Sequence, residues 1–125
     1  MIAADTGALS AFLKRENAAT SDSIAQALSS GDLVFPPVVV TELLSDPVAG
    51  RTLGKALPKV ALLDILDGYW QRAGENRRVL KAKGLKAKIA DTLIAQSCID
   101  HDVRLIALDG DFRHFAKYCG LKLAC

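Results

Sequence analysis

Short apolar segments alternate with helical patterns along nearly the whole sequence. Most of these segments are continuously apolar rather than alternating with polar residues, and they predict strands at residues 1–5, 33–35, 60–63, 103–108 and 121–124. Continuous apolar strands are typical of a parallel sheet that helices cover on both faces.

Between the apolar segments, apolar residues recur every three or four positions. This spacing predicts helices at residues 6–15, 21–30, 37–45, 47–56, 66–83, 88–101 and 111–118. Pro37 suits the first turn of its helix, and Gly84 suits the end of the longest one. Strands that alternate with helices over 125 residues predict an α/β fold with one domain spanning residues 1–125.

Four carboxylates end or interrupt apolar segments, where the pattern predicts buried positions. Asp5 and Asp109 end apolar strand segments, and Glu42 and Asp91 interrupt the apolar stretches of two predicted helices. Carboxylates are rarely buried unless they are paired or bind a metal. These four residues are therefore the candidates for a functional site.

The two helical carboxylates share the inward face of their helices. Glu42 follows Val39 by three positions, and Asp91 precedes Ile94 by three and Cys98 by seven. In parallel sheets, ligands bind beyond the carboxyl ends of the strands, which is where Asp5 and Asp109 fall. We therefore expect all four side chains to converge on one pocket.

Such a group of carboxylates suits Mg²⁺ or Mn²⁺, which prefer oxygen ligands. A cation held there leaves positions free for water and for a phosphate oxygen, so the pattern predicts metal-dependent hydrolysis of phosphodiesters.

Basic residues are concentrated between residues 72 and 88. This segment holds seven basic residues and one acid, hence +6, so the rest of the +2 chain carries −4. A solvated helix face explains the segment taken alone, but carboxylates elsewhere favour a surface that holds a polyanion. We assign RNA binding to Arg77, Arg78, Lys81, Lys83, Lys86 and Lys88.

The overall composition limits the class of protein and the cellular compartment that fit this chain. Half of the residues are hydrophobic, which allows a packed core, and no apolar run approaches the roughly 18 residues of a membrane span. No basic leader precedes Asp5, so we expect no signal peptide. The three cysteines lack the close pairs of a zinc site, and their odd number favours the reducing cytoplasm.

The sequence resembles the PIN-domain ribonucleases, and among them the VapC-type toxins of type II toxin–antitoxin pairs. The resemblance covers the whole chain and is carried by the four segments that contain Asp5, Glu42, Asp91 and Asp109, in this order and spacing. It implies a three-layer α/β/α sandwich with a central, mostly parallel sheet. It also implies Mg²⁺- or Mn²⁺-dependent endoribonuclease activity that inhibits translation, with a tRNA or rRNA as substrate, a homodimer, and an antitoxin that inhibits the enzyme.

Carried over by position, Asp5, Glu42, Asp91 and Asp109 match the acidic quartet of the family. Thr6 matches a frequent hydroxyl that orients a carboxylate or water, although it equally suits the N-cap of a helix. Asp111 either helps to bind metal or caps the helix that follows. Gly7 and Ala107 stand where the family often has hydroxyl residues, so metal affinity or rate is expected to be weaker.

Other functions fit less of the sequence. Asp5-Thr6-Gly7 reads like the tripeptide of aspartic proteases, but that fold is all-β. A phospho-acceptor aspartate of the dehalogenase-like type needs a second aspartate at position 7, which is glycine. A catalytically weak PIN-like module that binds RNA or protein without cutting is the remaining alternative. Tyr69 and Trp70 belong either to the core or to a partner face.

Overall fold

The computed structural model describes residues 1–56 and 59–124, with side chains described for residues 1–52 and 59–124. In these residues the strands are β1 (Ile2–Ala4), β2 (Leu33–Phe35), β3 (Ala61–Leu62) and β4 (Arg104–Ile106). The helices are α1 (Thr6–Leu13), α2 (Ala18–Ser29), α3 (Pro37–Leu44), α4 (Ala49–Ala56), α5 (Tyr69–Ala82), α6 (Ile89–His101) and α7 (Phe112–Cys119).

The sheet of the described residues is parallel throughout, with the order β3-β2-β1-β4. Ile2 of β1 pairs with Leu33 on one side and with Arg104 on the other. The predicted α/β fold with a parallel central sheet is confirmed. The strand predicted at residues 121–124 is wrong in extent, because only an isolated bridge joins Leu123 to Leu105.

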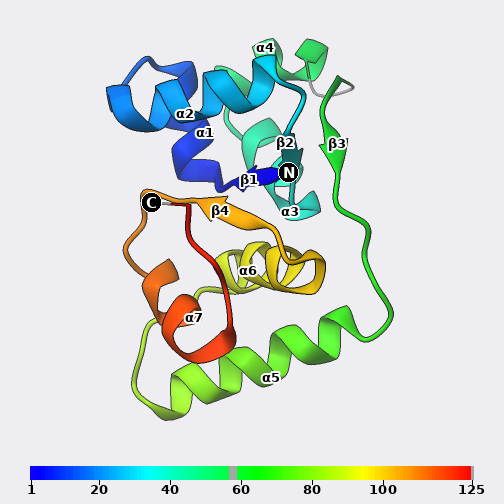
Figure 1. The fold of residues 1–125 in the computed structure, drawn as a ribbon, viewed down its shortest axis with the longest axis vertical. Coiled ribbons are helices and arrows are strands. Elements are labelled where there is room, and N and C mark those ends of the chain that lie inside the picture. The colour runs from blue at the N-terminus through cyan, green and yellow to red at the C-terminus, as the bar shows by residue number, and fades with distance from the viewer. Residues whose placement is uncertain (57–58, 125) are drawn as a thin grey trace.

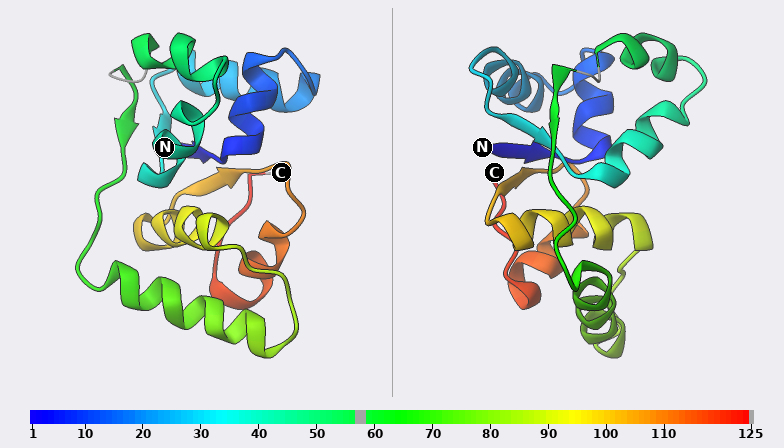
Figure 2. Two further views of the ribbon diagram at one scale, coloured as in Figure 1. Left: turned by 180° about the vertical axis from the view of Figure 1, so that it is seen from behind. Right: turned by 90° about the vertical axis from the view of Figure 1, so that its right-hand side faces the viewer.

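Helices cover both faces of the sheet. In Figure 1, α1 and α2 lie on one side of β1 and β4, while α6 and α7 lie on the other. Helix α5 lies further out, packed on the sides of α6 and α7 that face away from the sheet (Figure 2). No helix in the described part of the chain is long and apolar enough to cross a membrane.

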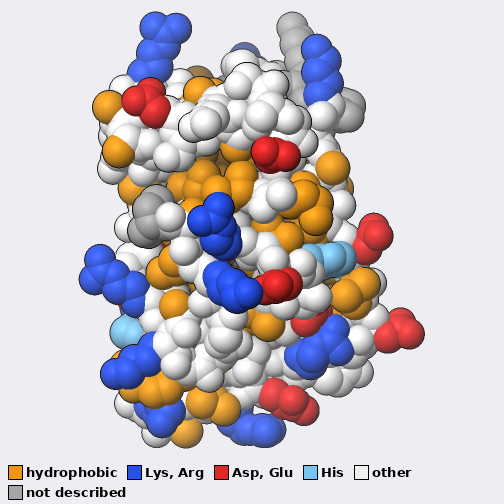
Figure 3. Space-filling view, in the orientation of Figure 1, with side chains coloured by type: hydrophobic (Ala, Val, Ile, Leu, Met, Phe, Trp, Pro, Cys, Tyr) orange, Lys and Arg blue, Asp and Glu red, His pale blue; other side chains and the backbone are white. Residues whose placement is uncertain are grey.

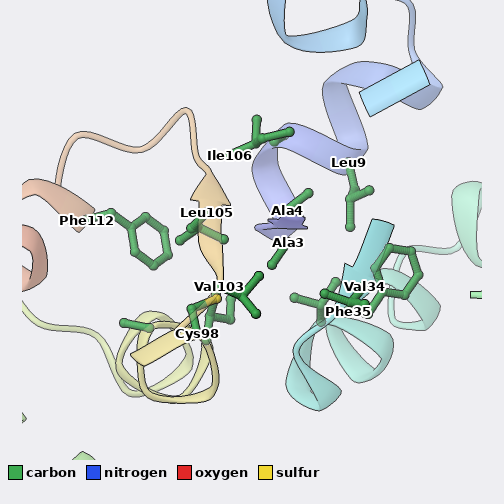
Figure 4. Close-up of a cluster of buried hydrophobic side chains, with 14 of the residues drawn as sticks. Ala3, Ala4, Leu9, Val34, Phe35, Cys98, Val103, Leu105, Ile106 and Phe112 are labelled. Carbon is green, nitrogen blue, oxygen red and sulfur yellow. The ribbon is translucent and has the colours of Figure 1, made fainter. Parts of the chain in front are cut away.

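The core is built around the small residues of β1. Ala3 and Ala4 are fully buried, and their methyl side chains leave room for larger neighbours on both sides. Figure 4 shows Phe35 of β2 on one side of this strand, with Leu105 of β4 and Phe112 of α7 on the other. Burial of large side chains such as these stabilises the fold by roughly 1.5–3 kcal/mol each.

A ladder of polar side chains attaches α5 to α6. Arg72 donates two hydrogen bonds to the carboxylate of Asp100, at 2.9 and 2.7 Å. The side chain of Gln96 donates to Asp100 and accepts from Asn76, both at 2.8 Å. The Arg72 guanidinium holds the pKa of Asp100 below its ordinary value. Because these hydrogen bonds join particular residues of the two helices, the ladder sets the register between them.

The first residues of α5 settle the prediction made for its aromatic pair. Tyr69 is buried and donates its hydroxyl to the carbonyl of Leu93 at 2.6 Å, whereas the Trp70 side chain is 62% exposed. One of the two aromatic residues therefore belongs to the core, and Trp70 remains available at the surface.

Candidate metal centre

The buried carboxylate of the candidate site is Asp5, directly after β1. Its backbone N–H donates to the carbonyl of Ile106 at 3.0 Å, which continues the pairing of β1 with β4. Its side chain is the N-cap of α1 and accepts a hydrogen bond from the N–H of Ala8 at 2.7 Å. Burial raises the pKa of Asp5 from 3.8 to about 6, because an ionised carboxylate loses hydration there.

Asp91 lies in the first turn of α6, where the helix dipole favours an anion. Burial, and next the charge of Asp109, raise its pKa to about 6. Within the described residues, Oδ2 of Asp91 is buried and has no hydrogen-bond partner. A buried oxygen without a donor costs free energy, so this atom is positioned for a ligand that is not part of the protein chain.

Asp109 and Asp111 follow β4 in the loop before α7. The N–H of Asp111 donates to Oδ1 of Asp109 at 2.9 Å, which holds the loop in a tight turn. Carboxylate oxygens of Asp91, Asp109 and Asp111 all lie within 4.8 Å of one another. The expectation that Asp109 ends a buried strand is wrong, because β4 stops at Ile106 and Asp109 is exposed.

Asp111 occupies the N-cap position of α7, but its side chain makes no capping hydrogen bond there. Its carboxylate instead faces the same space as those of Asp91 and Asp109. The geometry therefore favours the metal-binding role over the capping role that the sequence left open.

Glu42 reaches the site from α3 and is held by Thr6. The Thr6 hydroxyl donates to Oε1 of Glu42 at 2.6 Å, so the hydroxyl orients this carboxylate. The charges of Glu42, Asp91 and Asp109 all act to raise the pKa of Asp5, which requires them to lie near it. The four acids predicted to converge are thus brought together, although Asp5 and Glu42 lie outside the tight group formed by Asp91, Asp109 and Asp111.

The site fits a divalent cation. Its oxygen donors are the ligands that Mg²⁺ and Mn²⁺ prefer. A cation nearby would also offset the repulsion between the carboxylates and the cost of burying their charge, which are the two effects that raise the pKa values of Asp5 and Asp91. The buried Oδ2 of Asp91 accepts no hydrogen bond from the described residues, which is what a cation ligand at this position requires.

Gly7 leaves space beside Asp5. A Cβ atom at position 7 would lie 3.7 Å from Oδ2 of Asp5, at ordinary contact distance. The structure therefore leaves room for a side chain at position 7, where this chain has glycine.

Five of the six basic residues assigned to RNA binding divide into three settings, and the sixth, Lys86, is exposed between α5 and α6. Arg77, Arg78 and Lys81 line an open hollow of about 540 Å³ on α5. Lys88 precedes α6, and its charge lowers the pKa of Asp91, so it lies beside the carboxylates. Lys83 lies over the ring of Tyr118, with its Nζ 4.7 Å from the ring centre. Figure 3 shows Lys and Arg side chains around the lower end of the molecule, where α5 lies.

A parallel α/β sheet with a cluster of acids beyond the carboxyl ends of its strands is an arrangement that can hold a divalent cation. The particular family follows from sequence: a family model described as PIN domain matches residues 2–118. The chain belongs to the PIN-domain family, whose members are nucleases, and the predicted resemblance is confirmed.

Solved structures share the fold over nearly the whole chain. VapBC2 from Rickettsia felis bound to a DNA fragment from their promoter matches with a TM-score of 0.74 and 20% identity, covering 98% of this chain and 97% of that one. DNA-bound VapBC from Salmonella typhimurium matches at 0.71 and 16%, covering 98% and 97%. FitAcB from Neisseria gonorrhoeae matches at 0.72 and 18%, covering 98% and 96%. A comparison with curated proteins finds no match.

Proposed function

We propose that this protein is a Mg²⁺- or Mn²⁺-dependent endoribonuclease and the toxin of a type II toxin–antitoxin pair, acting in the cytoplasm. The observation that carries the proposal is the convergence of Asp91, Asp109 and Asp111, with the unpartnered oxygen of Asp91 among them. Membership of a nuclease family and the charge of Lys88 next to this cluster support the same reading.

The role proposed for each residue follows from its position in the site. Asp91, Asp109 and Asp111 would hold the cation, and Asp5 and Glu42 face it from β1 and α3. A divalent cation, when bound, makes nearby water more acidic and offsets negative charge on a phosphate. Thr6 keeps Glu42 in one orientation, which limits the rearrangement needed when substrate arrives. Lys88 lies at the edge of the cluster, where its charge favours a phosphate.

Cleavage of total RNA tests this proposal. The wild type with Mn²⁺ is expected to give discrete cuts that leave a 5′-phosphate, mapped by sequencing of RNA ends. Asp91→Ala or addition of EDTA is expected to abolish them, while circular dichroism shows that the variant remains folded. Asp22→Asn is the matched control, since Asp22 is exposed on α2 away from the cluster.

Full activity of Asp91→Ala, or of the wild type in EDTA, would refute the metal mechanism. A folded wild type that binds RNA and leaves it intact with either metal would favour the alternative, a PIN-like module that binds without cutting.

We further propose a small antitoxin as partner and a homodimer as the assembled state. The VapBC structures with the same fold support the first part. Expression of this chain should arrest growth and deplete an intact tRNA or rRNA, and co-expression of the product of an adjacent small reading frame should restore growth. Light scattering of the purified protein measures whether the free chain is a dimer.

A further inference from the structure

Two neighbouring hollows lie along α5, and the second of them extends to α6. The first, of about 540 Å³, is lined by Arg77, Arg78 and Lys81 together with Gly74 and Ala82. The second, of about 220 Å³, is a mainly apolar slot between the helices, and its lining residues are Trp70, Ala73, Gly74, Arg77, Ile89, Thr92 and Leu93. Gly74 and Arg77 line both hollows, so the two lie next to each other.

Gly74 keeps this space open without a structural need for glycine. It lies inside α5 in ordinary helical conformation, and a Cβ atom placed on it would meet nothing within 4 Å. Glycine in a helix interior is less stable than alanine, because it loses more backbone freedom on folding. The glycine therefore lowers the stability of α5, and no side chain extends from position 74 into either hollow.

The apolar slot carries an aromatic side chain held in one place. Trp70 is 62% exposed, and its ring meets that of Tyr69 edge-on, at 4.8 Å between centres and 84° between planes. Tyr69 itself is fixed by its hydrogen bond to Leu93. Ile89, 61% exposed, lies on the other helix that borders the slot. A flat apolar ligand can therefore enter between an ordered aromatic ring and an aliphatic wall.

The charges around the hollows select an anion. Among the described residues that line them, Arg77, Arg78 and Lys81 are basic and none is acidic. Arg77 is fixed by donating Nε to the carbonyl of Ala87 at 2.7 Å, so its position is set before a ligand arrives. Basic side chains next to an aromatic ring are the combination that binds single-stranded nucleic acid, through phosphates and base stacking together.

The slot and the carboxylates lie on opposite sides of the same end of α6. Ile89, Thr92 and Leu93 face α5 in the slot, whereas Asp91, between them in sequence, faces the acidic cluster. Lys88, next to the start of α6, lies beside Asp91. A single strand of nucleic acid that passes around this end of the helix meets the slot, then Lys88, then the carboxylates.

We propose that the hollow over Gly74 binds an unpaired nucleotide of RNA, with its base in the slot against Trp70 and its phosphates on Arg77, Arg78 and Lys81. The inference rests on the proposed function and narrows its substrate class to RNA that presents an unpaired base near the cleaved bond. Trp70 thereby becomes a binding residue, and Gly74 the residue that admits the base.

Trp70 is the single tryptophan of the chain, so tryptophan fluorescence reports on this slot alone. The wild-type protein is titrated in EDTA with a short single-stranded RNA, with the same RNA annealed to its complement, and with inorganic polyphosphate. Single-stranded RNA is expected to quench the fluorescence, because a base stacks on the ring. Polyphosphate should bind with little quenching, and duplex RNA should quench less than the single strand.

Variants at Gly74 test whether the space itself matters. Gly74→Leu fills the hollow, and the loss of one stacked base should weaken binding of single-stranded RNA about tenfold or more. Gly74→Ala should weaken it less and should raise the melting temperature. Gln71→Leu places the same side chain on an exposed position of α5 that lines neither hollow, and it should bind RNA as the wild type does.

The possible results separate this inference from the proposed function. Cleavage by the wild type, with no quenching and no effect of Gly74→Leu on RNA binding, overturns the nucleotide site and leaves the nuclease standing. Quenching that depends on protein concentration without RNA overturns it in favour of a second copy in the slot. Absence of both RNA binding and cleavage overturns the proposed function together with this inference.

Discussion

Replacing Asp5 by asparagine removes a charge from the end of β1 and keeps the oxygen that caps α1. The pKa of Asp5 rises from 3.8 to about 6 in the folded protein, which corresponds to about 3 kcal/mol of disfavour for the ionised form. Solvent screens little of this, because only 3% of Asp5 is exposed. We therefore expect Asp5→Asn to raise the free energy of unfolding of the metal-free protein by about 2–3 kcal/mol near pH 8.

The gain depends on pH because the folded state binds a proton at Asp5 more tightly than the unfolded chain does. Above pH 6 the carboxyl is ionised in both states, and the wild type bears the whole penalty. As the pH falls through 6 toward 3.8, the folded wild type takes up the proton and the penalty disappears. The advantage of Asp5→Asn should therefore shrink to less than about 1 kcal/mol near pH 4.

Urea unfolding followed by circular dichroism, in EDTA at both pH values, measures these differences. Asp22→Asn serves as the control, since it removes an exposed charge outside the cluster. A variant less stable than the wild type near pH 8, or equally stabilised at both pH values, would show that the buried charge is not what limits stability. Added Mn²⁺ should raise the midpoint of the wild type more than that of Asp5→Asn, because the variant offers one carboxylate fewer.

Further variants test the supports of the site and of α5. Thr6→Val frees Glu42 from its hydrogen bond and should slow cleavage about 10–100-fold in single-turnover assays, whereas Thr6→Ser should keep most of the rate. Arg72→Ala leaves the carboxylate of Asp100 without its cation and should lower the midpoint of urea unfolding, with Arg72→Ala/Asp100→Asn recovering part of the loss. Gly84→Ala should cost about 1 kcal/mol in thermal unfolding, because Gly84 has a φ of +73°.

The strands and most of the acids of the site were predictable from the sequence. An apolar segment that ends in a carboxylate marks both a buried strand and its exit, as Asp5 shows at the end of β1. Position within an apolar helical stripe likewise placed Asp91 toward the sheet. Both inferences succeed because the spacing of apolar residues in the local sequence predicts which positions are buried.

Asp109 and Asp111 show where local pattern is insufficient. The apolar run through Leu108 suggested a strand that the structure ends at Ile106, and Leu108 is 42% exposed. Hydrogen bonding to β1, whose own strand ends at Ala4, decides where β4 stops. A carboxylate before a helix has the same sequence signature whether it caps or binds a ligand, and the structure shows that Asp111 makes no capping hydrogen bond and lies beside Asp91 and Asp109.

The polar ladder between α5 and α6 was not predicted at all. Gln96 and Asp100 lie four positions apart on a helix that is largely buried, and the sequence does not say which helix packs on that face. Their partners, Arg72 and Asn76, lie in the segment for which the sequence favours a surface that holds a polyanion. Contacts between helices far apart in sequence depend on the packing of the whole chain.

The position of β1 between β2 and β4 has a consequence for the time at which the acidic cluster first exists during protein synthesis. The ribosome adds Asp5 more than 80 residues before its neighbours Asp91, Asp109 and Asp111. A nascent chain therefore carries Asp5 and Glu42 for a long part of its synthesis without the carboxylates that complete the cluster. If the folded protein cuts RNA as proposed, the topology keeps it harmless to the ribosome and the tRNAs that are making it until Asp111 has been added.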